Sequence, residues 1–124
     1  KDMRVRGNCG HIIHISSMSG HRVPTGTGGM YSATKHAVRA LTEALRRELR
    51  AMESQIRITA ISPGFVETEF AEVMLGDADA ARAVYDRFPC LKPADIASTV
   101  RHILSQPEHV EIHDVLLRPT EQTS

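Results

Sequence analysis

Short apolar runs and one long amphipathic segment set the pattern of this chain. Residues 11–16 (HIIHIS) are rich in isoleucine without clean alternation, which is typical of a strand buried on both faces in a parallel sheet. Residues 56–62 (IRITAIS) repeat the pattern and stop at a Pro-Gly pair. Between them, residues 17–29 hold a proline and four glycines, which predicts a loop.

Residues 30–52 contain neither glycine nor proline and predict one long helix. At 1.5 Å per residue, a helix of about 23 residues is roughly 35 Å long. Its apolar side chains form two rows, one of Ala33, Ala37, Ala40, Leu41 and Ala44 and the other of Val38, Leu45, Leu49 and Met52. A stripe of this width predicts burial on two sides, against a sheet and against another helix or subunit.

Shorter elements are predicted in the rest of the chain. Residues 70–88 predict two short helices broken at Gly76, with Asp77 or Asp79 as the cap of the second. Another helix begins at Lys92-Pro93 and runs to about Ser105, and residues 110–118 predict a last strand. The order strand, long helix, strand, helices, strand predicts parallel strands with a right-handed crossover, hence one α/β layered domain over residues 1–124.

Four special positions gather at one edge of this predicted sheet. Ligands of such folds bind beyond the carboxyl ends of the strands. Ser17 and Pro63-Gly64 directly follow the ends of the first two strands, and the long helix starts near the same edge. Tyr31 and Lys35 lie in its first turns at i, i+4 spacing, so they share one helix face.

A tyrosine beside a lysine can act as a general acid. A free tyrosine has a pKa of about 10, and a neighbouring ammonium group favours the phenolate and lowers that pKa. Tyr31 and Lys35 then suit a carbonyl oxygen that becomes an alkoxide as hydride arrives, and Ser17 can donate a hydrogen bond to the same oxygen. We expect structural roles for the flanking Ser16 and Ser19. The pair alone is weak evidence, because Tyr-x-x-x-Lys occurs by chance in many helices.

Three consecutive stretches make the pattern specific. They are GHIIHISSMSG, MYSATKHAVRALTEALRRELR and IRITAISPGFVETEF. In order and spacing they resemble the serine-bearing strand end, the YxxxK helix and the PG-terminated strand of classical short-chain dehydrogenase/reductases. The resemblance covers nearly the whole chain and implies the carboxyl-terminal half of a doubly wound, Rossmann-type parallel sheet with flanking helices. Two further segments, CLKPAD and LLRPTEQ, resemble a type associated with NADPH-linked reduction of keto-steroids and other carbonyls.

This resemblance implies an NAD(P)-dependent enzyme that interconverts a ketone and a secondary alcohol, with NADP, or alternatively NAD, as cofactor. By resemblance Tyr31 is the general acid/base, Lys35 lowers its pKa and holds the nicotinamide ribose, and Ser17 orients the substrate carbonyl. The implied lining of the nicotinamide end is Pro63, Gly64, Val66 and Thr68. The implied apolar contacts of the substrate lid are Phe70, Met74, Tyr85 and Phe88. The helix over 30–52 is also implied to form a homodimer or homotetramer interface.

The chain departs from the family pattern in several places. It does not contain the family's amino-terminal Gly-rich TGxxxGxG turn, cofactor discriminator, NNAG motif or catalytic asparagine. Its polar opening, KDMRVRGNCG, leads us to expect a piece of a longer protein. His14 and Thr59 stand where asparagines are frequent, and His113-Asp114 replaces the usual glycine turn. The alternative hypothesis is therefore a truncated, non-catalytic module for dimerisation or interaction.

Charge and cysteine content narrow the function classes. Lys plus Arg equals Asp plus Glu at 15 each, so nothing favours nucleic acid or an anionic membrane as a partner. The apolar runs are far shorter than the roughly 20 residues of a membrane span. Cys9 and Cys90 form no CxxC motif and predict free thiols in a reducing compartment, hence a cytoplasmic protein.

Other short motifs support weaker hypotheses. Residues 26–29 (GTGG) precede a helix like a phosphate-cradling loop, but no Walker lysine follows, so we expect a flexible loop. His11 and His14 are three apart on a strand and should lie on opposite faces, which disfavours a metal site. Without a GxSxG motif, a serine hydrolase that uses Ser17 and His21 is also disfavoured.

Overall fold

Helices and strands alternate along the chain in the computed structural model, which describes residues 2–25 and 28–123. In chain order the elements are α1 (Asp2–Val5), β1 (His11–Ile15), the 3-10 turn η1 (Met18–Gly20), α2 (Gly29–Ala51), β2 (Arg57–Pro63), α3 (Phe70–Leu75), α4 (Ala78–Tyr85), α5 (Pro93–Leu104) and β3 (Asp114–Leu117). The predicted order is confirmed. The sequence pattern did not predict α1 or η1, and β3 is shorter than the predicted strand.

The three strands form one parallel sheet in the order β1-β2-β3. The register pairs His11 with Arg57 and Ala60 with Asp114. The central strand β2 is buried along almost its whole length, and Ile58 and Ile61 are fully inaccessible to solvent. The expectation of burial on both faces is correct for β2 and wrong for β1, whose residues are half-buried or exposed because β1 lies at an edge of the described sheet.

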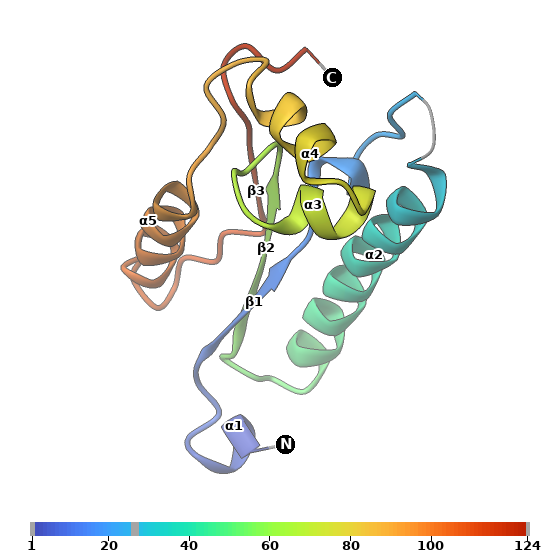
Figure 1. Ribbon diagram of the computed structural model, residues 1–124. Coiled ribbons are helices and arrows are strands. Elements are labelled where there is room, and N and C mark those ends of the chain that lie inside the picture. The colour runs from blue at the N-terminus through green and yellow to red at the C-terminus, as the bar shows by residue number, and fades with distance from the viewer. Residues whose placement is uncertain (1, 26–27, 124) are drawn as a thin grey trace.

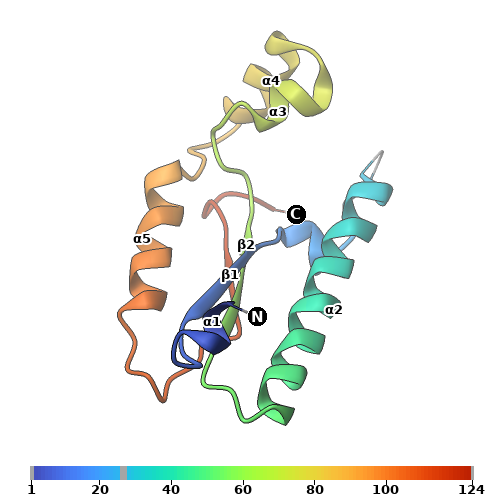
Figure 2. The same cartoon turned by 90° about the horizontal axis from the view of Figure 1, so that it is seen from below.

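Helices cover both faces of the sheet. Figures 1 and 2 show α2 on one face and α5 on the other, with α3 and α4 beyond the carboxyl end of β2. Leu49 of α2 packs with Ile56 and Ile58 in the apolar core, and Leu45 adds to this cluster. The other apolar row of α2 faces solvent, and Leu41 is 65 % exposed. The structure therefore buries one side of the apolar stripe and leaves the second side open.

The short helices begin and end at the residues that the sequence marks. Gly76 ends α3 in the left-handed conformation, with φ of 67°, which a glycine adopts without steric cost. Asp77, rather than Asp79, caps α4, because its carboxylate accepts hydrogen bonds from the backbone N–H groups of Asp79 and Ala80. Pro93 is the first residue of α5. Within residues 2–25 and 28–123, no helix combines the length and apolarity that a bilayer crossing requires.

Candidate active site

Ser17 lies in the turn that follows β1. It caps η1, and its Oγ accepts a hydrogen bond of 3.1 Å from the Ser19 backbone N–H. The preceding Ser16 is buried and donates its hydroxyl to the Lys35 carbonyl oxygen at 3.3 Å. Ser16 and Ser19 thus hold the turn, and the turn contacts α2 at Lys35. The hydrolase alternative finds no support here, because His21 bonds to Ser62 and not to Ser17.

Tyr31 and Lys35 lie on adjacent turns of α2, as predicted. The Lys35 ammonium nitrogen is 5.6 Å from the centre of the Tyr31 ring, within the range of a cation–π contact. The same nitrogen donates to the Ile15 carbonyl at 3.2 Å, at the carboxyl end of β1. Lys35 is therefore held between the strand end and the tyrosine ring. In the GTGG stretch (residues 26–29), which resembles a phosphate-cradling loop, Gly26 and Thr27 lie outside the described residues.

The predicted cofactor-side residues form the segment after β2. Pro63 is the buried last residue of the strand, and Gly64 follows it. Val66 pairs with Leu91 in an isolated parallel bridge, which fixes this segment. The Thr68 hydroxyl accepts a hydrogen bond of 3.2 Å from the Phe70 backbone N–H and so steers the chain into α3. This segment leads from the sheet edge into the two short helices.

The lid residues divide into two groups. The Phe70 ring lies 5.7 Å from the Tyr31 ring, so α3 reaches the tyrosine. Tyr85 packs inside the lid, where its hydroxyl accepts a hydrogen bond from a backbone N–H of α3. The Phe88 ring lies 6.0 Å from that of Phe65, in the segment after β2. Met74 is more than half exposed. Of the four lid residues, Phe70 is the one whose ring contact with the tyrosine is established.

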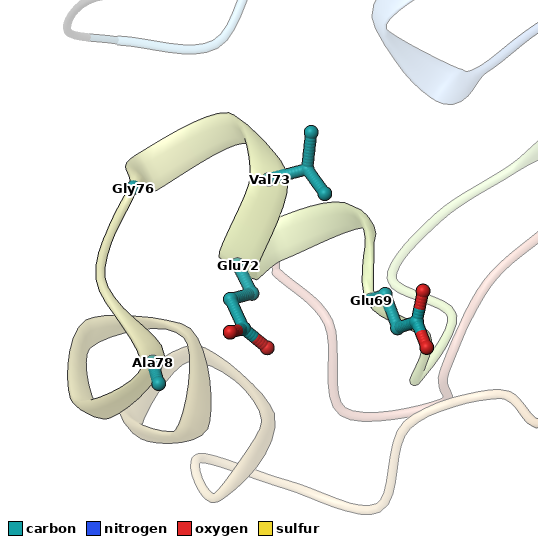
Figure 3. A pocket seen from close by; sticks show the side chains of 5 residues that line it. All are labelled: Glu69, Glu72, Val73, Gly76 and Ala78. Atoms are coloured by element: carbon teal, nitrogen blue, oxygen red, sulfur yellow. The ribbon is translucent and has the colours of Figure 1, made fainter.

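A shallow hollow of about 470 Å³ lies between α3 and the start of α4 (Figure 3). Glu69, Glu72, Val73, Gly76 and Ala78 line it. Of the predicted site residues, none belongs to this lining. The predicted catalytic residues Ser17, Tyr31 and Lys35 therefore lie at the sheet edge and not in this hollow.

The family is decided by a match to the short chain dehydrogenase family model over residues 1–78. This match covers the stretches that carry Ser17, Tyr31, Lys35 and the Pro63-Gly64 turn. The chain belongs to the short chain dehydrogenase family. The resemblance drawn from the sequence is thereby confirmed.

Similar proteins with curated sequences also belong to this family and show which of its members the chain resembles. The chain is 54% identical over 117 residues to human dehydrogenase/reductase SDR family member 11, covering 93% of this chain and 45% of the human protein. It is 37% identical over 120 residues to farnesol dehydrogenase of Aedes aegypti, covering 96% of this chain and 46% of that protein. This short chain dehydrogenase sequence thus spans about half the length of the relatives that it matches.

Solved structures of the family share the fold. Serine dehydrogenase complexed with NADP+ has a TM-score of 0.89 and 36% identity, over 98% of this chain and 48% of that structure. An alcohol dehydrogenase from the archaeon Thermococcus sibiricus, complexed with 5-hydroxy-NADP, has a TM-score of 0.76 and 27% identity, over 99% of this chain and 47% of that structure. The fold class inferred from the sequence, the carboxyl-terminal half of a Rossmann-type sheet, is confirmed.

Gln122, in the carboxyl-terminal segment, is a site residue that the sequence did not reveal. It is buried, and its Oε1 accepts a hydrogen bond of 3.0 Å from the Phe65 backbone N–H. Its amide nitrogen lies 3.8 Å from the sulfur of Met18, in the serine-bearing turn. Gln122 therefore joins the segment after β2 to the turn after β1, and only the tertiary fold places it there.

A methyl group at Gly64 should displace this segment. An added Cβ would lie 2.2 Å from Gln122 Oε1 and 2.8 Å from Arg118 Cβ. We expect Gly64→Ala to lower the free energy of unfolding by about 1–3 kcal/mol, as overpacking commonly does. Urea denaturation measures the change, with Gly29→Ala as control, because an added Cβ at Gly29 meets nothing within 4 Å. Equal stability of the two variants would contradict the tight fit at Gly64.

Burial lowers the pKa of two histidines, His11 and His21, below the ordinary value of 6.5. At His21 the nearby Asp114 carboxylate partly offsets burial by raising the pKa. Further lowering of the His21 pKa comes from Arg39, His36 and Arg22. A histidine with a lowered folded-state pKa is protonated first in the unfolded chain as pH falls. The folded state therefore loses stability as the pH falls below about 6.5, and the loss continues until the pH reaches the lower pKa of the folded state.

We expect the free energy of unfolding to decrease as the pH is lowered from about 7.5 to about 5.5. The double variant His11→Asn/His21→Asn should show a smaller decrease, because both histidines with lowered pKa values are removed. Urea denaturation at the two pH values measures the effect. His109→Asn serves as control, because His109 is exposed, and should keep the full decrease. An unchanged pH dependence in the double variant would refute the assignment.

Proposed function

We propose that this chain supplies the catalytic half of an NADP-dependent oxidoreductase that interconverts ketones and secondary alcohols. The observation that carries the proposal is the position of Lys35. Its ammonium group lies 5.6 Å from the Tyr31 ring centre while the Ile15 carbonyl holds it at the carboxyl end of β1. Ser17 follows β1 at the same edge. A proton donor, a cation and a hydroxyl thus occupy the edge where ligands of this fold bind.

Each side chain has a defined task in this proposal. Tyr31 gives its phenolic proton to the carbonyl oxygen as negative charge develops there, and takes it back in the alcohol direction. The Lys35 cation stabilises the phenolate that remains. Ser17 Oγ accepts a hydrogen bond from the Ser19 N–H, and its own proton can then be donated to the substrate oxygen.

The residues of this edge fit the nicotinamide end of NADP, which supplies the hydride when bound. Lys35 uses one N–H on the Ile15 carbonyl, and its remaining donors suit ribose hydroxyls. We assign the nicotinamide end to Tyr31, Lys35, Pro63, Gly64, Val66 and Thr68. The similarity to structures solved with NADP+ and 5-hydroxy-NADP supports NADP over NAD.

The proposed substrate is an apolar carbonyl compound such as a keto-steroid. Apolar side chains of α3 are exposed: Phe70 by 50%, Val73 by 81% and Met74 by 58%. The Phe70 ring also contacts Tyr31 directly. Similarity to farnesol dehydrogenase supports an alcohol as the reduced partner. The free thiols Cys9 and Cys90 support a cytoplasmic location.

A chimaeric enzyme tests this proposal, because the chain spans about half the length of its relatives. In the chimaera, this chain replaces the matching half of the human relative. We expect NADPH oxidation that depends on added ketone, with a lower KM for ketones of steroid size than for small polar ketones. A folded chimaera that binds NADPH yet oxidises none of it with any ketone would overturn the proposal and favour the non-catalytic module.

We also propose that the chain forms a homodimer or homotetramer through α2. The helix presents an exposed apolar row that the sheet does not cover, of Ala33, Ala37, Ala40, Leu41 and Ala44. Burial of such a row against a second copy of the helix is favourable. Sedimentation at tens of micromolar should show a dimer or tetramer, and Leu41→Glu should dissociate it. Arg101→Glu, at an exposed position of α5 on the other face of the sheet, is the control. A monomeric wild-type chain would contradict this proposal.

A further inference from the structure

Four polar side chains, three from α2, β2 and β3 and one from the residue after η1, meet beside the serine-bearing turn. We call them the Asp114 cluster: His21 after η1, Arg39 of α2, Ser62 of β2 and Asp114 of β3. Asp114 Oδ1 accepts a hydrogen bond of 2.9 Å from the Ser62 hydroxyl. Asp114 Oδ2 lies 3.1 Å from His21 Nε2 and 3.4 Å from Arg39 Nε. Both carboxylate oxygens are therefore engaged, by a hydroxyl, an imidazole and a guanidinium.

The Asp114 cluster is not a hydrolase triad, although it contains serine, histidine and aspartate. In a triad the aspartate and the serine bond to different nitrogens of the imidazole. Here His21 Nε2 faces both Ser62 Oγ, at 3.0 Å, and Asp114 Oδ2. Ser62 is also fully buried, so no substrate reaches its hydroxyl. The Ser62 hydroxyl has one proton and uses it in the hydrogen bond to Asp114. His21 Nε2 must therefore be the protonated nitrogen and donate to Ser62 Oγ.

The cluster is joined directly to the turn that carries Ser17. Arg39 donates through Nη1 to the Gly20 carbonyl at 2.9 Å, and Gly20 is the last residue of η1. At Gly20 the turn and α2 touch backbone to backbone, since an added Cβ would lie 2.8 Å from the Lys35 carbonyl oxygen. Arg39 is one helical turn beyond Lys35. Arg39 therefore binds the turn close to the part of α2 that carries the proposed catalytic Lys35.

The cluster also binds the turn from its other end. His21 immediately follows η1, and its Nε2 is fixed by Ser62 and Asp114 on two neighbouring strands. The side chains of His21 and Asp114 are 21% and 28% exposed, so these contacts are shielded from water more than a surface ion pair. Removal of the Asp114 charge would leave Arg39 and His21 without their common acceptor.

We propose that Asp114, through His21 and Arg39, positions the Ser17 turn against α2 and so sets where Ser17 lies relative to Tyr31 and Lys35. These three are positioning residues, and none of them touches the substrate. The inference rests on the proposed function for its catalytic consequence. Its structural consequence, a turn held by a charge on β3, can be tested in the chain itself. The proposal assigns a role to Asp114, which in the sequence stands where the family has a glycine turn.

The structural test is amide hydrogen exchange in the 124-residue chain. Asp114→Asn keeps the size and an acceptor for Ser62 but removes the negative charge. We expect exchange at the Ser19, Gly20 and His21 amides to become about tenfold faster or more, the change that matches loss of one charged hydrogen bond. Glu111→Gln is the matched control, since Glu111 accepts from the Ile58 N–H and lies near Arg46, away from the turn. Unchanged exchange in Asp114→Asn, or equal acceleration in Glu111→Gln, would overturn the proposal.

The catalytic test uses the chimaera. Asp114→Asn should lower kcat for ketone reduction by about tenfold or more while the KM for NADPH stays the same, because only the Ser17 turn shifts. Arg39→Lys, which keeps the charge but cannot bridge Asp114 and the Gly20 carbonyl in the same way, should fall between wild type and Asp114→Asn. Glu111→Gln should keep its kcat. An inactive wild-type chimaera would contradict the proposed function alone, and the exchange result would still decide the role of Asp114. A normal kcat in an active Asp114→Asn chimaera would overturn the proposed positioning role of Asp114.

Discussion

Replacement of Tyr31 by phenylalanine is expected to lower kcat for ketone reduction in the chimaera by at least about a hundredfold, the scale of general acid catalysis. The substitution removes only the phenolic hydroxyl. The ring remains, and with it the contact to Phe70 at 5.7 Å and the contact to the Lys35 ammonium group at 5.6 Å. The loss of rate therefore reports the proton and not the packing.

The matched control is Tyr85→Phe, because the chain contains two tyrosines. Tyr85 Oη accepts a hydrogen bond from the Ala71 backbone N–H inside the lid, so its removal should affect stability more than rate. The KM for NADPH should change little in either variant. Near-normal ketone reduction by Tyr31→Phe would show that another group donates the proton.

The 124-residue chain by itself is expected to bind NADPH at least about a hundredfold more weakly than the chimaera does, a difference of roughly 2.8 kcal/mol. In dinucleotide-binding folds the pyrophosphate rests on a Gly-rich turn and a helix amino terminus. The sequence of this chain contains no TGxxxGxG turn. The proposed contacts of the chain are confined to the nicotinamide end, where Tyr31, Lys35 and Thr68 lie.

Calorimetric titration with NADPH and NADH measures this affinity. The binding experiment requires a folded sample, because β1 forms an edge of the described sheet and an unpaired edge strand favours aggregation. A circular-dichroism spectrum and a sedimentation profile recorded on the same sample meet that requirement. Micromolar affinity for NADPH in a folded, non-aggregated sample would contradict the prediction.

The sequence predicted the elements whose signals are local. The long helix over 30–52 contains no breaker, and the structure begins and ends it within one residue of that range. Gly76 and Asp77 mark the break between α3 and α4 because a left-handed residue and an N-cap each have a strong residue preference. The positions of Ser17, Tyr31 and Lys35 at one sheet edge follow from the parallel crossover.

The sequence did not predict features that depend on residues far apart in the chain. The buried amide of Gln122 and the carboxylate of Asp114 each contact elements more than fifty residues away. No periodicity or spacing marks such a residue. The half-buried state of β1 was also missed, because an isoleucine-rich run has the same composition at the edge and in the centre of a sheet.

The most direct test of the central claim is a crystal structure of the chimaera with NADP+ and a bound ketone or alcohol. The distances to measure join the substrate oxygen to Ser17 Oγ and to Tyr31 Oη. The proposed function predicts both at hydrogen-bond length, about 2.6–3.2 Å. A substrate oxygen bound in the site but in contact with neither hydroxyl would contradict it.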